Sequence, residues 1–208
     1  MFKILSKRRL NPTMTWLVID APLVAKKARP GQFIILRTDE YGERIPLTMA
    51  GHDAEKGTID LIYAAVGRTT MLMDQLEEGD YLLDVVGPLG KPTHMEGLKR
   101  VAVVGGGTGN ALAYPLATGM HKEGIHVDMI AGFKNKEMVI LEDEFKAGTD
   151  RLFLTTDDGS YGEKGFTTDK LKELIEAGNE YDEIVAVGPP VMMKFVCKIA
   201  EEYGIPSV

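Results

Sequence analysis

The segment VAVVGGGTG at residues 101–109 constrains this chain most, because four apolar β-formers run into a cluster of glycines. A helix-like apolar pattern follows, so the segment predicts a strand, a tight turn and a helix. Glycines at such a turn let backbone N–H groups approach a pyrophosphate at the helix N-terminus. The residues suited to that contact are Gly105, Gly106, Gly107, Thr108 and Gly109.

This turn departs from the strict phosphate-binding fingerprints. The pattern G-x-G-x-x-G would need glycine at Asn110, and the Gly-Lys-Ser/Thr of a Walker loop is absent. Pro115 falls inside the following helix pattern, where we expect it to kink or loosen the first turns. A glycine turn that only packs the strand against the helix therefore remains an alternative.

The chain after residue 100 has the pattern of a parallel sheet. Apolar strand runs alternate with helical stretches, which is typical of strands joined by crossover helices. The strand runs are 101–104, 127–133, 152–156 and 183–187. Near the end, Pro190 opens a helix whose apolar stripe is Met192, Phe195, Val196, Ile199 and Tyr203, and Gly204 closes it. The final IPSV resembles the start of another strand, so we expect the chain to be a fragment of a longer protein.

The chain before residue 97 has a different sequence pattern. Short β-rich runs separated by turn signals predict a small antiparallel barrel or sandwich. These runs are 13–20, 32–38, 58–66 and 80–86, and the only helical candidate is 70–78. Glycine and proline concentrate in residues 87–99, so the sequence predicts a β domain over 1–97 and an α/β domain over 98–208.

Composition excludes several classes of function. The net charge of -7 comes without a basic stripe, so a nucleic acid is not an expected partner. Cys197 is the only cysteine, and it cannot form an intrachain disulfide or a multi-cysteine metal site. No apolar run approaches the roughly 20 residues that span a bilayer, and no secretory signal opens the chain. We expect a cytoplasmic protein without a membrane span.

Two segments of the β domain offer further phosphate ligands. In GERIPLTMAG (42–51), Arg44 supplies a guanidinium at a strand edge, ahead of Pro46, Leu47 and Thr48. After Gly67, Thr69 and Thr70 open the short predicted helix, where hydroxyls and free N–H groups can bind a phosphate oxygen. The alternatives are a solvated arginine and an ordinary helix cap.

Together these segments resemble the ferredoxin-reductase superfamily. The resemblance rests on ARPGQFIILR (28–37), ERIPLTMA (43–50), VGRTT (66–70), VGPLGKP (86–92), VAVVGGGTG (101–109), TTDDGSYGEKG (155–165) and VGPPVMM (187–193). It implies an antiparallel FAD-binding barrel followed by a parallel-sheet nucleotide-binding domain. Within the superfamily, the chain is most similar to electron-transfer subunits of dihydroorotate dehydrogenase B. It is also similar to the small FAD/NAD-binding subunits of NADH-dependent reduced ferredoxin:NADP oxidoreductases, or sulfide dehydrogenases.

The resemblance implies a flavin site in the first domain. Arg44 would contact the FAD pyrophosphate, and Gly67, Thr69 and Thr70 would bind it from the other side. Pro46, Leu47 and Thr48 would lie along the isoalloxazine, with the Thr48 hydroxyl near the hydride-accepting N5. The wider superfamily has an aromatic residue at the position of Pro46, so the flavin would here make apolar contacts instead of that stack.

The resemblance also implies a nicotinamide-dinucleotide site in the second domain. Gly105 to Gly109 would face the pyrophosphate, and Gly188 and Pro189 would lie beside the nicotinamide. Leu112 stands where the family usually has proline, which puts the shape of the helix entry in question. Asp157 or Asp158 would bind a ribose hydroxyl and favour NAD(H) over NADP(H), with an Asp-Gly turn that binds no ligand as the alternative.

The implied function is hydride transfer between NAD(H) and FAD, which requires no general base. Electrons would then pass through a C-terminal 2Fe-2S module to a larger flavin or iron–sulfur subunit. The cysteines of that module are absent from this sequence, so this chain would not bind the cluster. Two alternatives remain: a self-sufficient NAD(P)H:ferredoxin or flavin reductase, and a non-catalytic dinucleotide-sensing module.

Overall fold

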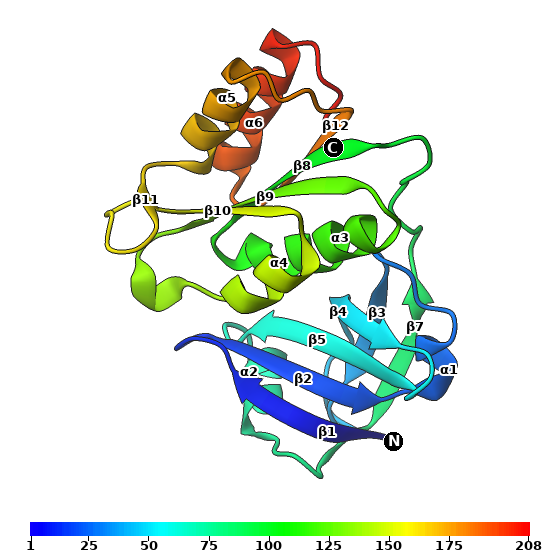
Figure 1. Ribbon diagram of the computed structural model, residues 1–208. Coiled ribbons are helices and arrows are strands. Elements are labelled where there is room, and N and C mark those ends of the chain that lie inside the picture. The colour runs from blue at the N-terminus through cyan, green and yellow to red at the C-terminus, as the bar shows by residue number, and fades with distance from the viewer. The chain divides into compact units, whose positions relative to one another are not determined.

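The computed structural model describes residues 1–208 and divides into two compact units, which are described separately (Figure 1). The β unit comprises Met1–His94 and the α/β unit comprises Met95–Val208. No helix in either unit is long and apolar enough to cross a membrane.

The β unit is a seven-stranded antiparallel sheet that curls into a near-barrel, as the sequence predicts. Its strand order is β6-β1-β2-β5-β4-β3-β7. The strands are β1 (Phe2–Arg9), β2 (Met14–Asp20), β3 (Phe33–Arg37), β4 (Ile45–Asp53), β5 (Thr58–Ala64), β6 (Tyr81–Leu82) and β7 (Asp84–Leu89). Two helices accompany them, α1 (Pro22–Ala25) and α2 (Arg68–Gln75).

Alternating side chains build the core of this unit. Leu17 and Ile19 of β2, Ile34 of β3 and Leu61 of β5 are fully buried in one cluster. Side chains of a strand point alternately to opposite faces, so every second residue of these runs lines the interior. Each buried aliphatic side chain contributes about 1.5–3 kcal/mol relative to exposure, and the cluster therefore holds the sheet in its curled form.

The α/β unit is a five-stranded parallel sheet in the order β11-β10-β9-β8-β12, which confirms the predicted class. Its strands are β8 (Arg100–Gly106), β9 (His126–Phe133), β10 (Arg151–Thr156), β11 (Glu163–Lys164) and β12 (Glu183–Val187). Its helices are α3 (Asn110–Lys122), α4 (Glu142–Gly148), α5 (Thr167–Glu176) and α6 (Pro190–Glu202), with short 3-10 turns at Gly107–Gly109 and Lys136–Met138. Pro115 lies inside α3, which continues past it.

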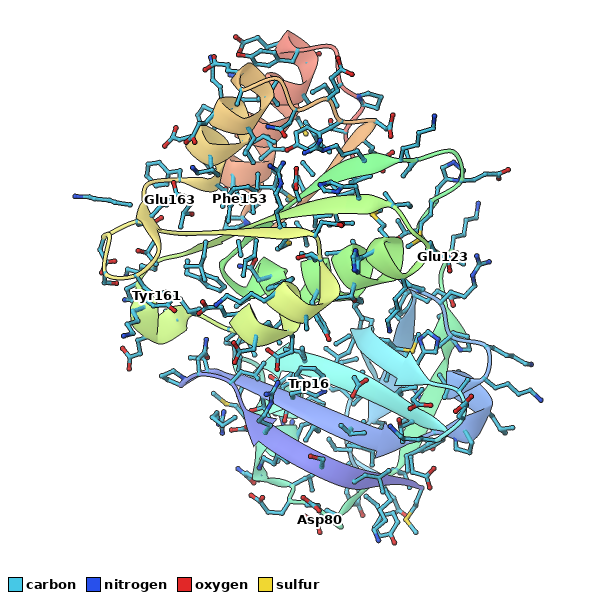
Figure 2. The ribbon with its side chains drawn as sticks, viewed as in Figure 1. Trp16, Asp80, Glu123, Phe153, Tyr161 and Glu163 are labelled. Atoms are coloured by element: carbon cyan, nitrogen blue, oxygen red, sulfur yellow. The ribbon has the colours of Figure 1, made fainter.

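Helices cover both faces of this sheet (Figure 1). Leu171 of α5 and Val196 of α6 pack with Ala102 and Val104 of β8, so these helices cover the face on which even-numbered β8 residues lie. Phe153 of β10 packs against the same cluster and can be followed in Figure 2. Helices α3 and α4 lie on the opposite face.

The last residues of the chain lie beside β12. The Ile184 N–H donates to the carbonyl of Pro206 at 2.9 Å, and Ser207 forms a parallel bridge with Ile184. The expected strand-like character of IPSV is therefore present as a single bridge.

A buried carboxylate ties the sheet together at the amino ends of its strands. The Asp128 side chain is completely buried and accepts hydrogen bonds from the Tyr181 hydroxyl at 2.8 Å and from the guanidinium groups of Arg100 and Arg151. Burial would raise the pKa of Asp128, but the hydrogen bonds from Arg151, Tyr181 and Arg100 outweigh it and lower the pKa to about 2.

Candidate functional site

A cavity of about 640 Å³ opens at the carboxyl ends of the parallel strands. Gly106, Gly132 and Thr155 stand next to one another in the register of β8, β9 and β10, and all three line it. The two glycines of that row allow close packing at the strand ends, because a Cβ at Gly106 would collide with Met192 and one at Gly132 would collide with Thr167. The other lining residues are Gly107, Phe133, Lys134, Asp157, Phe166, Thr167, Thr168, Asp169, Pro189, Val191, Met192 and Phe195.

The cavity lies at the point where the strand order reverses. From β8 the chain proceeds to β9 and β10 on one side, and β12 is added on the other side of β8. Open parallel sheets bind ligands outside the carboxyl ends of their strands at such a switch point. Gly106 at the end of β8 and Pro189 after β12 flank it here.

Thr155 provides the clearest sign that the cavity accepts a polar ligand. The residue is 3% exposed, and its hydroxyl has no hydrogen-bond partner within the chain. A buried hydroxyl without a partner is destabilising, so a ligand that forms a hydrogen bond with it would remove that cost and bind more tightly. Sequence reasoning missed Thr155, although a threonine that ends an apolar strand at a carboxyl edge is a usable signal.

The rim of the cavity is apolar and exposed. Phe166 is 61% exposed and Phe195 is 50% exposed, and Val191 is exposed beside them. On the predicted apolar stripe of α6, Val196 is buried and Met192 and Ile199 pack against the core, whereas Phe195 is exposed. Exposed aromatic side chains at the rim suit a ligand with a flat ring.

The predicted glycine turn divides into residues that face the cavity and residues that serve packing. Gly106 and Gly107 line the cavity, and Gly107 has the positive φ of +55° that glycine adopts readily. A Cβ at Gly105 would collide with the Asn110 side chain, and one at Gly109 would collide with the Val187 carbonyl. Thr108 is exposed but does not line the cavity.

Of the other residues predicted to bind the dinucleotide in this unit, some line the cavity and some do not. Asp157 lines the cavity, whereas the Asp158 carboxylate lies outside it and accepts the Ser160 N–H at 2.9 Å. Hydrogen bonds from Ser160 lower the pKa of Asp158. Pro189 lines the cavity, but Gly188 does not: a Cβ there would crowd the Gly106 backbone, so Gly188 lets the two turns approach.

In the β unit, Arg44 lies just before β4, and its side chain is 59% exposed. Its guanidinium donates to the Asp84 carboxylate at 3.3 Å, while Arg37 holds the same carboxylate at 2.7 Å. Because Arg44 makes one long contact to a carboxylate that already has a partner, most of its donors are available to an anion.

Strand alternation separates the three predicted residues that follow Arg44. Leu47 packs against the core of the near-barrel, so its side chain lies on the face opposite Pro46 and Thr48. Pro46 is exposed and Thr48 is half-buried. Only Pro46 and Thr48 therefore offer side chains on the outer face of β4, and Leu47 offers its backbone.

At the start of α2, the Thr70 hydroxyl accepts the N–H groups of Val66 and Gly67 and donates to the Gly67 carbonyl. Thr69 is buried. The Thr70 side chain therefore caps the helix, in agreement with the simpler alternative, and the first-turn N–H groups remain the donors for an anion. The predicted start at Thr70 was two residues late, because α2 begins at Arg68.

The register of the sheet brings the two segments of the β unit to the same end. Antiparallel β4 and β5 pair Met49 with Leu61 and Asp53 with Thr58. The amino end of β4 and the segment leaving β5 toward α2 therefore lie at the same end of the strands. Arg44 and the start of α2 are therefore both found at this end of the β unit.

Comparisons with known proteins agree with this geometry. A family model described as the oxidoreductase NAD-binding domain matches residues 103–198. The dihydroorotate dehydrogenase B (NAD(+)) electron transfer subunit homolog of Thermotoga maritima is 45% identical over 188 residues, which cover 90% of this chain and 66% of that protein. The dihydroorotate dehydrogenase B (NAD(+)) electron transfer subunit of Streptococcus pneumoniae R6 is 32% identical, covering 97% of this chain and 78% of that protein.

A solved structure of NADH-dependent reduced ferredoxin-NADP oxidoreductase, described in work on flavin-based electron bifurcation, has a chain 40% identical to this one. The two superimpose with a TM-score of 0.91 over 100% of this chain and 74% of that chain. The fold is therefore the same throughout the 208 residues.

Proposed function

This chain belongs to the ferredoxin-reductase superfamily, close to the electron-transfer subunits of dihydroorotate dehydrogenase B, and from that premise we propose that it transfers a hydride between NAD(H) and FAD. The α/β unit would bind NAD(H) and the β unit would bind FAD. Electrons would then pass to a larger flavin or iron–sulfur subunit. The single cysteine of the 208 residues cannot ligate a 2Fe-2S cluster, so that step would need cysteines from elsewhere.

The unpartnered Thr155 hydroxyl in the cavity of the α/β unit carries the proposal. It supports a ligand with a polar group that reaches the floor beneath the apolar rim. A dinucleotide has both a polar chain and flat rings, and Phe166 and Phe195 offer surfaces for a ring. Asp157, at the same edge, would accept a hydrogen bond from a ribose hydroxyl and repel a 2'-phosphate.

The residues of the β unit fit a flavin dinucleotide. Arg44 would neutralise its pyrophosphate together with the first-turn N–H groups of α2. Bound FAD would supply the hydride-accepting N5 atom and the ability to release electrons singly. The Thr48 hydroxyl would act as the hydrogen-bonding group near that atom, and Pro46 would make an apolar contact with the ring.

Replacing Thr155 with valine tests the nucleotide site. Valine has the same shape without the hydroxyl, so thermal stability should stay level or rise, because a buried unpaired group is removed. The Kd for NADH, measured by calorimetric titration, should rise about fivefold to tenfold, as expected for one lost hydrogen bond. Thr155→Ser keeps the hydroxyl, so its Kd for NADH should stay within about twofold of the wild-type Kd. That change is smaller than the change expected from the loss of one hydrogen bond.

The opposite results would contradict the assignment. Unchanged NADH affinity in Thr155→Val would mean that the hydroxyl has no ligand. A loss of stability in the same variant would mean that the hydroxyl is bonded within the protein.

A further inference from the structure

A buried amide side chain joins the glycine turn to the neighbouring strand. Asn110, the first residue of α3, is completely buried. Its Nδ2 donates to the carbonyl of Gly107 at 3.0 Å and to the carbonyl of Gly132, in β9, at 3.1 Å. The residue thus occupies the position where the strict fingerprint has its third glycine, and it fills that position with a two-point contact.

These contacts fix the direction of one peptide group. A trans peptide is planar, and its C=O and N–H point in opposite directions. Because Asn110 holds the Gly107 carbonyl inward, the Thr108 N–H of the same peptide points away from Asn110. Gly107 and Thr108 are both exposed, so that N–H faces the open side of the turn.

Asn110 also removes carbonyl oxygens from the side where an anion would lie. A carbonyl oxygen that faces a phosphate repels it, and Gly107, at φ +55°, has the backbone freedom to rotate its peptide. The Asn110 backbone N–H also donates to the Gly107 carbonyl, and the contact from Nδ2 adds to it in opposing that rotation. It also ties the turn to β9, whose Gly132 is part of the row that lines the cavity.

The neighbouring glycine accommodates this arrangement. A Cβ at Gly105 would collide with the amide oxygen of Asn110, so Gly105 is required by the asparagine side chain and not by contact with a ligand. The same amide oxygen is buried without a hydrogen-bond partner. The side chain is therefore held through its donor nitrogen alone, which makes the two carbonyl contacts its evident role.

We propose that Asn110 is a positioning residue that orients the Gly107–Thr108 peptide, so that the Thr108 N–H binds the dinucleotide pyrophosphate. The inference rests on the proposed NAD(H) site and adds a residue that acts through the backbone. It also explains why this turn does not need the third glycine. In the strict fingerprint that glycine allows the helix and strand to pack closely, whereas here the Asn110 side chain stabilises the turn by donating hydrogen bonds.

The test compares a ligand that has a pyrophosphate with one that lacks it. ADP-ribose and adenosine are titrated into ¹⁵N-labelled wild type, Asn110→Ala and Asn110→Asp, and backbone amide shifts give each Kd. The control is Thr118→Ala, which removes another side-chain hydrogen bond of α3, from the Thr118 hydroxyl to the Tyr114 carbonyl at 2.8 Å. Thermal unfolding of each variant confirms that it is folded.

In the wild type, ADP-ribose should shift the Thr108 amide strongly downfield. Asn110→Ala should weaken ADP-ribose binding on the order of tenfold, lose that shift and leave adenosine affinity within about twofold. Asn110→Asp should weaken it further, because its carboxylate would face two carbonyl oxygens. Thr118→Ala should behave as the wild type. If Asn110→Ala does not fold, Asn110→Asp answers the same question, because it keeps the shape of the side chain and removes the Nδ2 donor.

Retained ADP-ribose affinity in Asn110→Ala, or equal weakening of ADP-ribose and adenosine, would overturn the assignment of Asn110 while leaving the NAD(H) site intact. Failure of the wild type to bind ADP-ribose would instead overturn the proposed function, and the role of Asn110 with it.

Discussion

Replacing Arg44 with alanine separates flavin binding from the stability of the β unit. The Arg44 side chain is 59% exposed, and its contact with Asp84 is 3.3 Å long. Asp84 keeps the shorter contact with Arg37 when Arg44 is removed. Exposed ion pairs contribute about 0–1 kcal/mol, so the free energy of unfolding should change little.

The effect on FAD should be much larger. A charge-assisted hydrogen bond to a phosphate contributes about 1.5–3 kcal/mol, which corresponds to a roughly 10- to 150-fold increase in the Kd for FAD. The assay is titration of the apoprotein with FAD, followed by quenching of flavin fluorescence. Lys56→Ala is the matched control, because it removes the same charge from a side chain that is 79% exposed and pairs only locally with Asp53.

Two results would refute the reasoning. Equal FAD affinity in Arg44→Ala and Lys56→Ala would remove Arg44 from the flavin site. A fall of several kcal/mol in the stability of Arg44→Ala would show that the arginine supports the fold, and any loss of flavin would then be indirect.

Two further predictions concern the α/β unit. Asp157→Asn should raise the ratio of kcat/KM for NADPH to kcat/KM for NADH on the order of tenfold, because it removes a carboxylate that repels a 2'-phosphate. Steady-state reduction of ferricyanide measures both values of kcat/KM. Asp158→Asn is the control and should leave the ratio unchanged. Hydrogen bonds from Arg151, Tyr181 and Arg100 hold the folded-state pKa of Asp128 at about 2, below its ordinary value of 3.8, so its stabilisation of about 2 kcal/mol is present above about pH 5 and is lost as the pH falls toward 2. Urea unfolding should show that loss in the wild type and not in Asp128→Asn; equal pH profiles would contradict it.

The parallel sheet could be predicted because its central strands β8 and β9 are continuous apolar runs, buried on both faces. Strand β1 was not predicted, and β4 was predicted only as a strand edge at Arg44 to Thr48. In β1 only Ile4 is fully buried, so the run FKILSKRR lacks a clear alternation. In β4, Pro46 and Gly51 interrupt the pattern, although Pro46 pairs with Ile35 near the strand's start and the register shifts beside Gly51.

The candidate site was predicted only in part, because it depends on register. The glycine turn could be found from a local motif, and Asp157 and Pro189 from the family resemblance. The role of Asn110 could not, because it depends on the alignment of β8 with β9, which local sequence does not specify. Thr155 was missed although it ends an apolar strand at a carboxyl edge. The Leu47 side chain packs against the core, so Leu47 could contribute only its backbone to the flavin site, because consecutive strand residues point to opposite faces.

The central claim is that one chain binds both FAD and NAD(H) and moves a hydride between them. The most direct measurement is the visible spectrum of the purified chain, reconstituted with FAD, before and after anaerobic addition of NADH. We predict a flavin spectrum that NADH bleaches. A preparation that takes up no FAD would contradict the claim and favour a dinucleotide-sensing module, and a bound flavin that NADH leaves oxidised would contradict hydride transfer.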